Sequence, residues 1–121
     1  MNPQYLKHAA FNLHQAAETA YACFLLVWTF YFPRSHNLKF LRSLAEDKDR
    51  RLIEAWPRET KLDRRRFELL KRAYVEARYS DAYVISADDL LAIGAAVRTL
   101  RTIVDSTSRE RLDDLRQRAG L

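Results

Sequence analysis

The sequence predicts an all-helical domain, an up-and-down bundle of four to five helices, and three observations support this fold class. The chain has 121 residues, 48% of them hydrophobic and 12% aromatic, which suffices for one compact core. It contains only two glycines and three prolines, too few for the tight turns that a multi-stranded sheet needs. Apolar residues recur at helical spacing along the chain. We therefore expect a single domain over residues 1–121, with its core at about 5–105 and a helical extension at 106–121.

The first helix is expected to run from about residue 5 to residue 32, because the residue before Pro33 is disfavoured in helical geometry. From Tyr21 onward nearly every position is apolar, so a single helix face cannot hold all these side chains. A small domain has little surface with which to cover them. We therefore predict a homodimer that packs through the first helix, the alternative being that this half is the central helix of the bundle.

The second helix is expected to begin at Ser35 or Asn37, because either side chain can cap free backbone amides. It should end near Asp47. Residues 48–63 are interpreted as a loop with one helical turn, because Trp56-Pro57 breaks the helical pattern.

The third helix is expected over residues 63–79, with Thr60 and Asp63 in the pattern of a capping box at its start. Ser86 is the expected cap of the fourth helix, and two aspartates in the first turn favour its positive end. We expect the polar run 105–108 to interrupt this helix. The residues beyond it would then form an exposed helix, a frayed end or a segment that docks on a partner.

The net charge of +5 is concentrated in one segment. Residues 34–66 contain eleven basic and six acidic side chains, whereas the segments on either side are balanced. An acidic partner such as a nucleic acid would meet this middle segment, although a run of charges is more often a solvated face. An interaction bundle for protein or nucleic acid is therefore one alternative function.

Other features exclude some classes of protein. The single cysteine, Cys23, has no partner for a disulfide, which favours a reducing, cytoplasmic setting. The longest apolar stretch, 21–32, is shorter than the ~20 residues that span a bilayer, so we expect no membrane span and no signal peptide. The chain has no pattern of metal-ligating side chains, and we expect no metal and no cofactor.

Two polar clusters at predicted helix ends, residues 35–38 and 77–83, indicate a ligand site. Arg78 has a planar guanidinium that matches two phosphate oxygens, and His36 lies near an electropositive helix start. A tyrosine of the second cluster could stack on a base. The candidate ligand-binding residues are Arg78, His36, Tyr79, Asn37, Gln15, Glu18, Asp81 and Tyr83. The alternative is a buried polar network, formed by Gln15, Glu18, His36 and Arg78, that only pins the helices together.

Three segments in order resemble the HEPN family, whose name stands for higher eukaryotes and prokaryotes nucleotide-binding. They are residues 12–18 (Asn-Leu-His-Gln-Ala-Ala-Glu), 35–38 (Ser-His-Asn-Leu) and 74–79 (Tyr-Val-Glu-Ala-Arg-Tyr). The resemblance covers about residues 8–104. Members of the family are small helical bundles, generally dimeric, and many occur beside or fused behind a minimal nucleotidyltransferase.

The resemblance implies a domain that binds a nucleotide or another phosphorylated ligand. It also implies that the domain assists a nucleotidyltransferase, in the same chain or in another, without catalysis of its own. Residues 36–44 and 67–79 are especially similar to proteins that carry both domains in one chain. An interpretation of this chain as the C-terminal part of such a protein therefore stays open.

A ribonuclease function is the second alternative that the resemblance raises. Some HEPN proteins are metal-independent ribonucleases with an arginine four to six residues before a histidine. Among His8, His14 and His36, only the last is closely preceded by an arginine, Arg34, two residues away. The chain also lacks the Arg-His-Tyr pattern of antitoxin-paired members. A general acid or base would have to come from elsewhere, so the sequence favours binding over catalysis.

Overall fold

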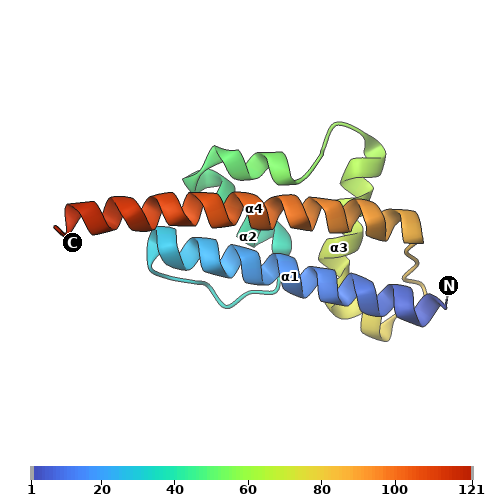
Figure 1. The fold of residues 1–121 in the computed structure, drawn as a ribbon. Helices are drawn as coiled ribbons and strands as arrows, with labels where there is room; N and C mark the ends of the chain where they lie inside the picture. The colour runs from blue at the N-terminus through green and yellow to red at the C-terminus, as the bar shows by residue number, and fades with distance from the viewer. Residues whose placement is uncertain (1, 121) are drawn as a thin grey trace.

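A computed structural model describes residues 2–120 of the chain. These residues form four α-helices and one 3₁₀ helix, and none of them lies in a strand, which confirms the predicted all-helical bundle. The elements are α1 (Pro3–Thr29), α2 (Leu38–Lys48), η1 (Arg50–Ala55), α3 (Lys61–Tyr79) and α4 (Ala87–Arg118) (Figure 1).

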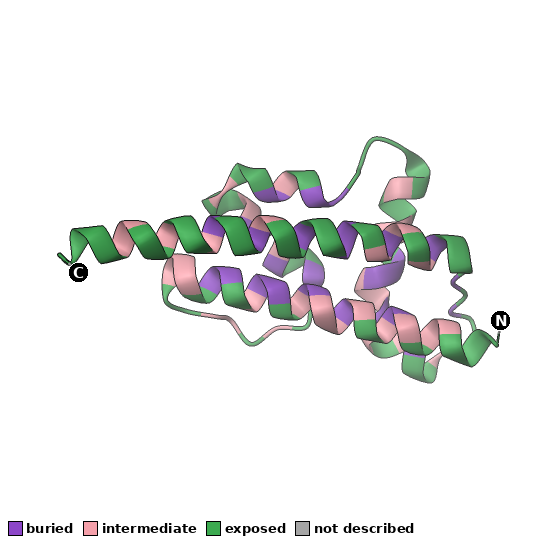
Figure 2. Cartoon of the chain, in the orientation of Figure 1, coloured by how far each residue is buried: buried purple, intermediate pink, exposed green. Residues whose placement is uncertain are grey.

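Helices α1 and α4 lie side by side and run in the same direction (Figure 1). Near their starts, Leu6 of α1 and Leu90 of α4 line one groove, and farther along, Trp28 of α1 lies 5.4 Å from the Arg111 guanidinium of α4. Helix α3 crosses behind this pair, and the C-terminal turns of α4 project beyond the end of α1. Those projecting turns are largely exposed (Figure 2).

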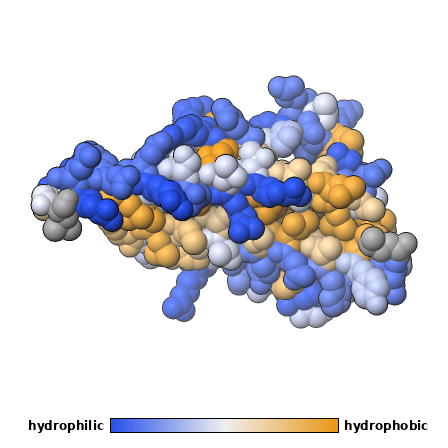
Figure 3. Space-filling model, viewed as in Figure 1, coloured by the Kyte–Doolittle hydropathy of each residue, from blue (hydrophilic) through white to orange (hydrophobic). Residues whose placement is uncertain are grey.

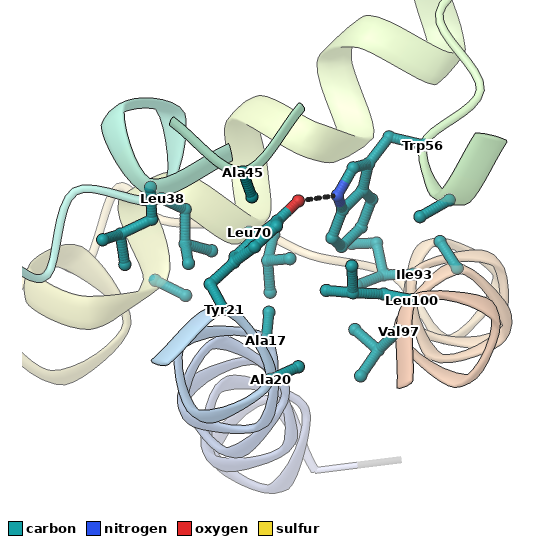
Figure 4. Close-up of a cluster of buried hydrophobic side chains, with 14 of the residues drawn as sticks. Ala17, Ala20, Tyr21, Leu38, Ala45, Trp56, Leu70, Ile93, Val97 and Leu100 are labelled. Carbon is teal, nitrogen blue, oxygen red and sulfur yellow. Dashed lines mark hydrogen bonds between the residues drawn. The ribbon is translucent and has the colours of Figure 1, made fainter. Parts of the chain in front are cut away.

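The core lies where α1 meets the other helices, and it contains a buried hydrogen bond between two aromatic side chains (Figure 4). The indole Nε1 of Trp56 donates a hydrogen bond of 2.7 Å to the hydroxyl oxygen of Tyr21. Burial raises the pKa of Tyr21. Because a buried tyrosine hydroxyl needs a partner, this bond ties α1 to the residue that follows η1.

The second half of α1 is largely covered by the chain itself. Tyr21, Phe24 and Leu25 are buried in the core, while Leu26 and Phe30 stay exposed. Packing within the bundle thus buries much of the apolar surface for which the sequence predicts a second copy of the chain. Among the described residues, no helix combines the length and the apolar character needed to cross a membrane.

The predicted helix caps are confirmed, although α1 begins at Pro3 and α3 at Lys61, each two residues before the predicted start. Asn37 caps α2, accepting a hydrogen bond from the backbone amide three residues later. Both α3 and α4 begin with a full capping box, formed by Thr60 with Asp63 and by Ser86 with Asp89. These side chains satisfy amides that would otherwise lack partners at the first turn of each helix.

The first helix ends earlier than the sequence predicts, at Thr29 rather than at residue 32. Phe30 adopts the left-handed conformation with φ of 61°, which closes the helix before the proline is reached. The Thr29 hydroxyl donates to the Leu25 carbonyl at 2.6 Å. The chain then reverses direction and runs back along α1 toward α2 (Figure 1).

The predicted interruption of the last helix at 105–108 is wrong, because α4 continues from Ala87 to Arg118. Asp105 forms an ion pair with Arg109 one turn later, at 3.1 Å. Thr107 is buried, and its hydroxyl donates to the Ile103 carbonyl at 2.8 Å. Polar residues that find partners within the helix do not break it.

Candidate functional site

The two leading candidates from the sequence, His36 and Arg78, meet at one aromatic ring. The imidazole of His36 stacks on Tyr74 with ring centroids 4.0 Å apart and planes inclined by 11°. The guanidinium carbon of Arg78 lies 4.7 Å from the centroid of the same ring. The segment between α1 and α2 supplies the histidine, and α3 supplies the other two residues. We name this group, with its α1 neighbours, the aromatic–cation cluster: Phe11, His14, Glu18, His36, Tyr74 and Arg78.

His36 is fixed from two sides by α1. Its Nδ1 lies 3.0 Å from both carboxylate oxygens of Glu18. Its backbone carbonyl accepts a hydrogen bond of 3.1 Å from Nε2 of His14. The His36 side chain nevertheless keeps 53% of its surface exposed, so it is oriented without being sealed from water.

His14 is the buried member of the cluster. Burial lowers the pKa of His14, against the opposing effect of the nearby Glu18 carboxylate. Its ring also lies 5.4 Å from the ring of Tyr74. His14 therefore supports the cluster from beneath and holds the segment that contains His36.

Arg78 is exposed and is held in place by contacts that leave much of its guanidinium unused. Its Nε donates to the Tyr74 carbonyl at 2.8 Å, and the guanidinium carbon lies 4.8 Å from the Phe11 ring centroid and 5.0 Å from that of Tyr79. No acidic side chain within residues 2–120 forms an ion pair with it. An incoming anion can therefore reach its terminal nitrogens.

The exposed flank of the cluster adds a second cation and a free ring. The Tyr79 side chain, next to Arg78, is 76% exposed. The ammonium group of Lys7 donates to the Ser80 carbonyl at 3.1 Å, which places it near the end of α3. A ring face and two positive charges thus lie close together at this helix end.

The other predicted site residues are not members of the cluster, although Gln15 and Asn37 adjoin His14 and His36 in the sequence. Asn37 is occupied as the cap of α2, Gln15 lines a groove between α1 and α4, and Asp81 is exposed in the turn after α3. Tyr83 is fully buried, its hydroxyl donates to the Leu69 carbonyl at 2.7 Å, and burial raises its pKa to about 12. The ring of Tyr83 therefore belongs to the core, and the prediction that it could stack on a ligand is corrected.

The buried-network alternative describes only part of this arrangement. Glu18 and His36 do pair, but Gln15 lies on the α4 side of α1, and Arg78 is exposed. The cluster is therefore a partly solvated surface supported by one buried histidine, His14.

Sequence reasoning missed Tyr74 and Phe11 as members of the site. For both residues, helical spacing in the sequence indicates the neighbour on the same helix face. Tyr74 precedes Arg78 by four residues and so shares its face of α3. Phe11 precedes His14 by three residues in the same way on α1.

The basic middle segment is neutralised in part by contacts within the domain, because four of its eleven basic side chains form ion pairs among residues 2–120. Arg42 and Arg58 both pair with Glu46, at 3.1 and 2.7 Å. Arg51 forms a two-sided ion pair with Asp49 and Glu110, and Arg66 pairs with the buried Asp89 at 3.0 Å. These pairs reduce the positive charge that the segment can offer to a nucleic acid.

The fold and the cluster define a small helical domain with a pre-arranged surface of aromatic rings and cations. Comparison with protein families matches residues 2–111 to the HEPN domain, so the chain belongs to the HEPN domain family. This confirms the family resemblance seen in the sequence and places the chain among helical domains related to nucleotides or RNA. A search of curated proteins found no match to the chain.

Proposed function

We propose that this domain binds a nucleotide or another phosphorylated ligand at the aromatic–cation cluster. The observation that carries the proposal is the state of Arg78, which is fixed by the Tyr74 carbonyl and ring, forms no ion pair, and lies beside the exposed Tyr79 ring. A pre-oriented guanidinium binds phosphate with less loss of side-chain entropy than a mobile one.

Arg78 and His36 of the cluster, with Lys7 and Tyr79 beside it, each have a role in this proposal. The terminal nitrogens of Arg78 would donate to two phosphate oxygens, and Lys7 would add a second positive charge. The exposed ring of Tyr79 would stack on a base. Nδ1 of His36 donates to the Glu18 carboxylate, so Nε2 of the neutral imidazole would accept a hydrogen bond from a sugar hydroxyl.

We further propose that the domain assists an associated nucleotidyltransferase, in the same chain or in another, and has no chemistry of its own. The support is the HEPN family membership together with the residues of the cluster. Arg78 and Tyr79 are suited to hold a ligand, and Glu18 is suited to position His36. We therefore give these residues binding and positioning roles.

A homodimer through the first helix is also part of the proposal, with its interface at the start of α1 rather than at the end. An apolar groove of about 600 Å³ runs between the N-terminal halves of α1 and α4. It is lined by Leu6, Ala9, Leu13, Leu90, Leu91 and Gly94 among others, and Leu91 is 73% exposed. Figure 3 shows the apolar surface around the start of these helices. Exposed apolar patches of this kind are typical of protein contacts.

Binding is tested by isothermal titration and thermal shift with ATP, GTP and AMP. The wild-type domain is expected to bind at least one of them, and Arg78→Ala to weaken that binding about tenfold or more, because charge-assisted hydrogen bonds to phosphate are lost. Arg78→Lys should restore it only in part, since an ammonium lacks the planar fork. Arg65→Ala is the matched control, because Arg65 is also exposed on α3 and is not part of the cluster.

Two results would overturn the proposal. One is the absence of any thermal shift with millimolar nucleotide, and the other is unchanged affinity in Arg78→Ala. Cleavage of RNA by the purified domain in the presence of a chelator, lost in the same variant, would instead assign it to the ribonucleases.

A further inference from the structure

A second hollow lies between α1 and α4, on a different side of α1 from the aromatic–cation cluster. It has a volume of about 800 Å³ and is open to solvent. We name it the α1–α4 groove, and the lining residues that matter most are Gln15, Thr19, Cys23, Arg98, Arg101 and Ser108. Figure 3 shows hydrophilic side chains along α4 next to apolar surface on this face.

The α4 wall of the groove carries positive charge that no carboxylate neutralises. Arg98 and Arg101 lie one turn apart and are exposed, and neither forms an ion pair with any acidic side chain in the described part of the chain. The one carboxylate that lines the groove, Asp105, is paired with Arg109 at 3.1 Å. Arg98 and Arg101 therefore differ from four arginines of the middle segment that form ion pairs, which are Arg42, Arg51, Arg58 and Arg66.

The α1 wall combines small apolar side chains with polar ones. Ala16 and Ala20 line the groove and leave its volume unfilled, and Val27 continues the apolar surface toward the end of α1. Thr19 adds a hydroxyl on the same wall. At that end the Ser108 hydroxyl is buried and has no hydrogen-bond partner among residues 2–120. The groove thus offers an apolar surface and two cations that form no ion pair among the described residues.

We propose that the α1–α4 groove binds an organic anion with an apolar body. The anionic group would lie between Arg98 and Arg101, and the apolar body would cover Ala16, Ala20 and Val27. This site is separate from the one proposed for nucleotides. The variants that test the two sites are therefore different.

The chain contains one cysteine, Cys23, and it lines the groove, so its reaction rate reports on the groove alone. Two aromatic disulfide reagents are compared: 5,5′-dithiobis(2-nitrobenzoate), which is a dianion, and 4,4′-dithiodipyridine, which is neutral. In Arg98→Gln/Arg101→Gln the ratio of the anionic to the neutral rate is expected to fall about fivefold to tenfold, because two nearby cations are lost. Arg116→Gln, which removes an exposed arginine from the last turn of α4, should leave the ratio unchanged.

Binding is measured with 8-anilino-1-naphthalenesulfonate, an aromatic ring system that carries a sulfonate. The wild-type domain is expected to bind it saturably and to become protected at Cys23 against the neutral reagent. The double arginine variant should bind it about tenfold more weakly, whereas Arg116→Gln should bind it as the wild type does. Circular dichroism verifies that each variant is folded.

Three outcomes would overturn the proposal. The first is an unchanged rate ratio in the double variant. The second is dye binding that leaves Cys23 unprotected, which would place the dye in the apolar groove instead. The third is a Cys23 that neither reagent reaches in a dimeric protein, which would show that a second copy covers the α1–α4 groove.

Discussion

The two sides of α1 differ in how far their polar groups are already satisfied. Toward α3, Glu18 and His14 bind the segment that contains His36, and the rings pack on one another. Toward α4, Arg98 and Arg101 face small side chains and have no acidic partner among the described residues. Paired groups contribute to stability, whereas unpaired groups are available to a ligand. Substitutions of His14, Glu18 or Tyr74 on the α3 side should therefore change folding, and those of Arg98 or Arg101 on the α4 side should change binding alone.

The largest expected effect is that of Tyr74→Ala. The ring contacts His36, Arg78 and Phe11, so its removal should lower the free energy of unfolding by about 3 kcal/mol. Arg98→Ala on the other side of α1 should change it by less than about 0.5 kcal/mol. Urea unfolding measures both. Equal losses in the two variants would contradict the comparison.

Acidification should also lower the free energy of unfolding, through His14 on the α3 side of α1. Burial lowers the pKa of His14 in the folded domain below its ordinary value of 6.5. The unfolded chain then takes up the proton first, so the free energy of unfolding should fall as the pH drops below about 6.5 and level off below the folded-state pKa. Thermal melts between pH 8 and pH 5 measure this. The slope should flatten in His14→Gln, and an unaltered slope there would assign the effect to other groups.

A smaller loss is expected from Glu18→Gln. The change removes the charge that faces Nδ1 of His36 at 3.0 Å and should cost about 1.5 kcal/mol, because the carboxylate is mostly buried. Segment 30–37 should also become more sensitive to limited proteolysis, since His36 fastens it to α1. The control is Glu68→Gln on α3, whose exposed pair with Lys71 should contribute less than about 0.5 kcal/mol. Equal losses of stability and equal proteolysis in the two variants would show that Glu18 does not hold segment 30–37 on α1.

The smallest expected effect is that of Gly94→Ala. This variant distinguishes the stability of the monomer from its association through the apolar groove. A methyl group added at Gly94 meets no atom within 4 Å, so Gly94→Ala should raise the free energy of unfolding of the monomer by about 0.8 kcal/mol through helix propensity. If a second copy packs closely on Gly94, the same methyl should weaken the dimer in sedimentation experiments. A monomeric wild-type protein would rule out the proposed homodimer.

Local features of the fold were predictable from the sequence. The caps at Asn37, Thr60 and Ser86 depend on residues within one helical turn, and all three were predicted. The continuation of α4 through 105–108 was not predicted, because it depends on whether polar residues find partners within the helix. In the structure Thr107 is buried and its hydroxyl donates to the Ile103 carbonyl, so the helix continues.

The site was predictable only in part. The helix-end positions of His36 and Arg78 indicated a shared site, and the two residues do meet. The stacking of His36 on Tyr74 was missed, because segment 30–37 is held against α1 by contacts between residues far apart in sequence, such as that of His14 with the His36 carbonyl. The burial of Tyr83 likewise depends on tertiary packing, and helical spacing carries no signal for it.

The parallel course of α1 and α4 aligns two helix macrodipoles, which repel one another when they lie side by side. Helix α1 has no acidic residue in its first turn and no basic residue in its last. Only α4 carries the compensating charges, Asp88 and Asp89 at its start and Arg116 and Arg118 at its end. The two aspartates therefore offset the positive end of α4, whereas the start of α1 has no such charge within its own first turn. At the far end of the bundle, the projecting turns of α4 keep its negative pole away from that of α1.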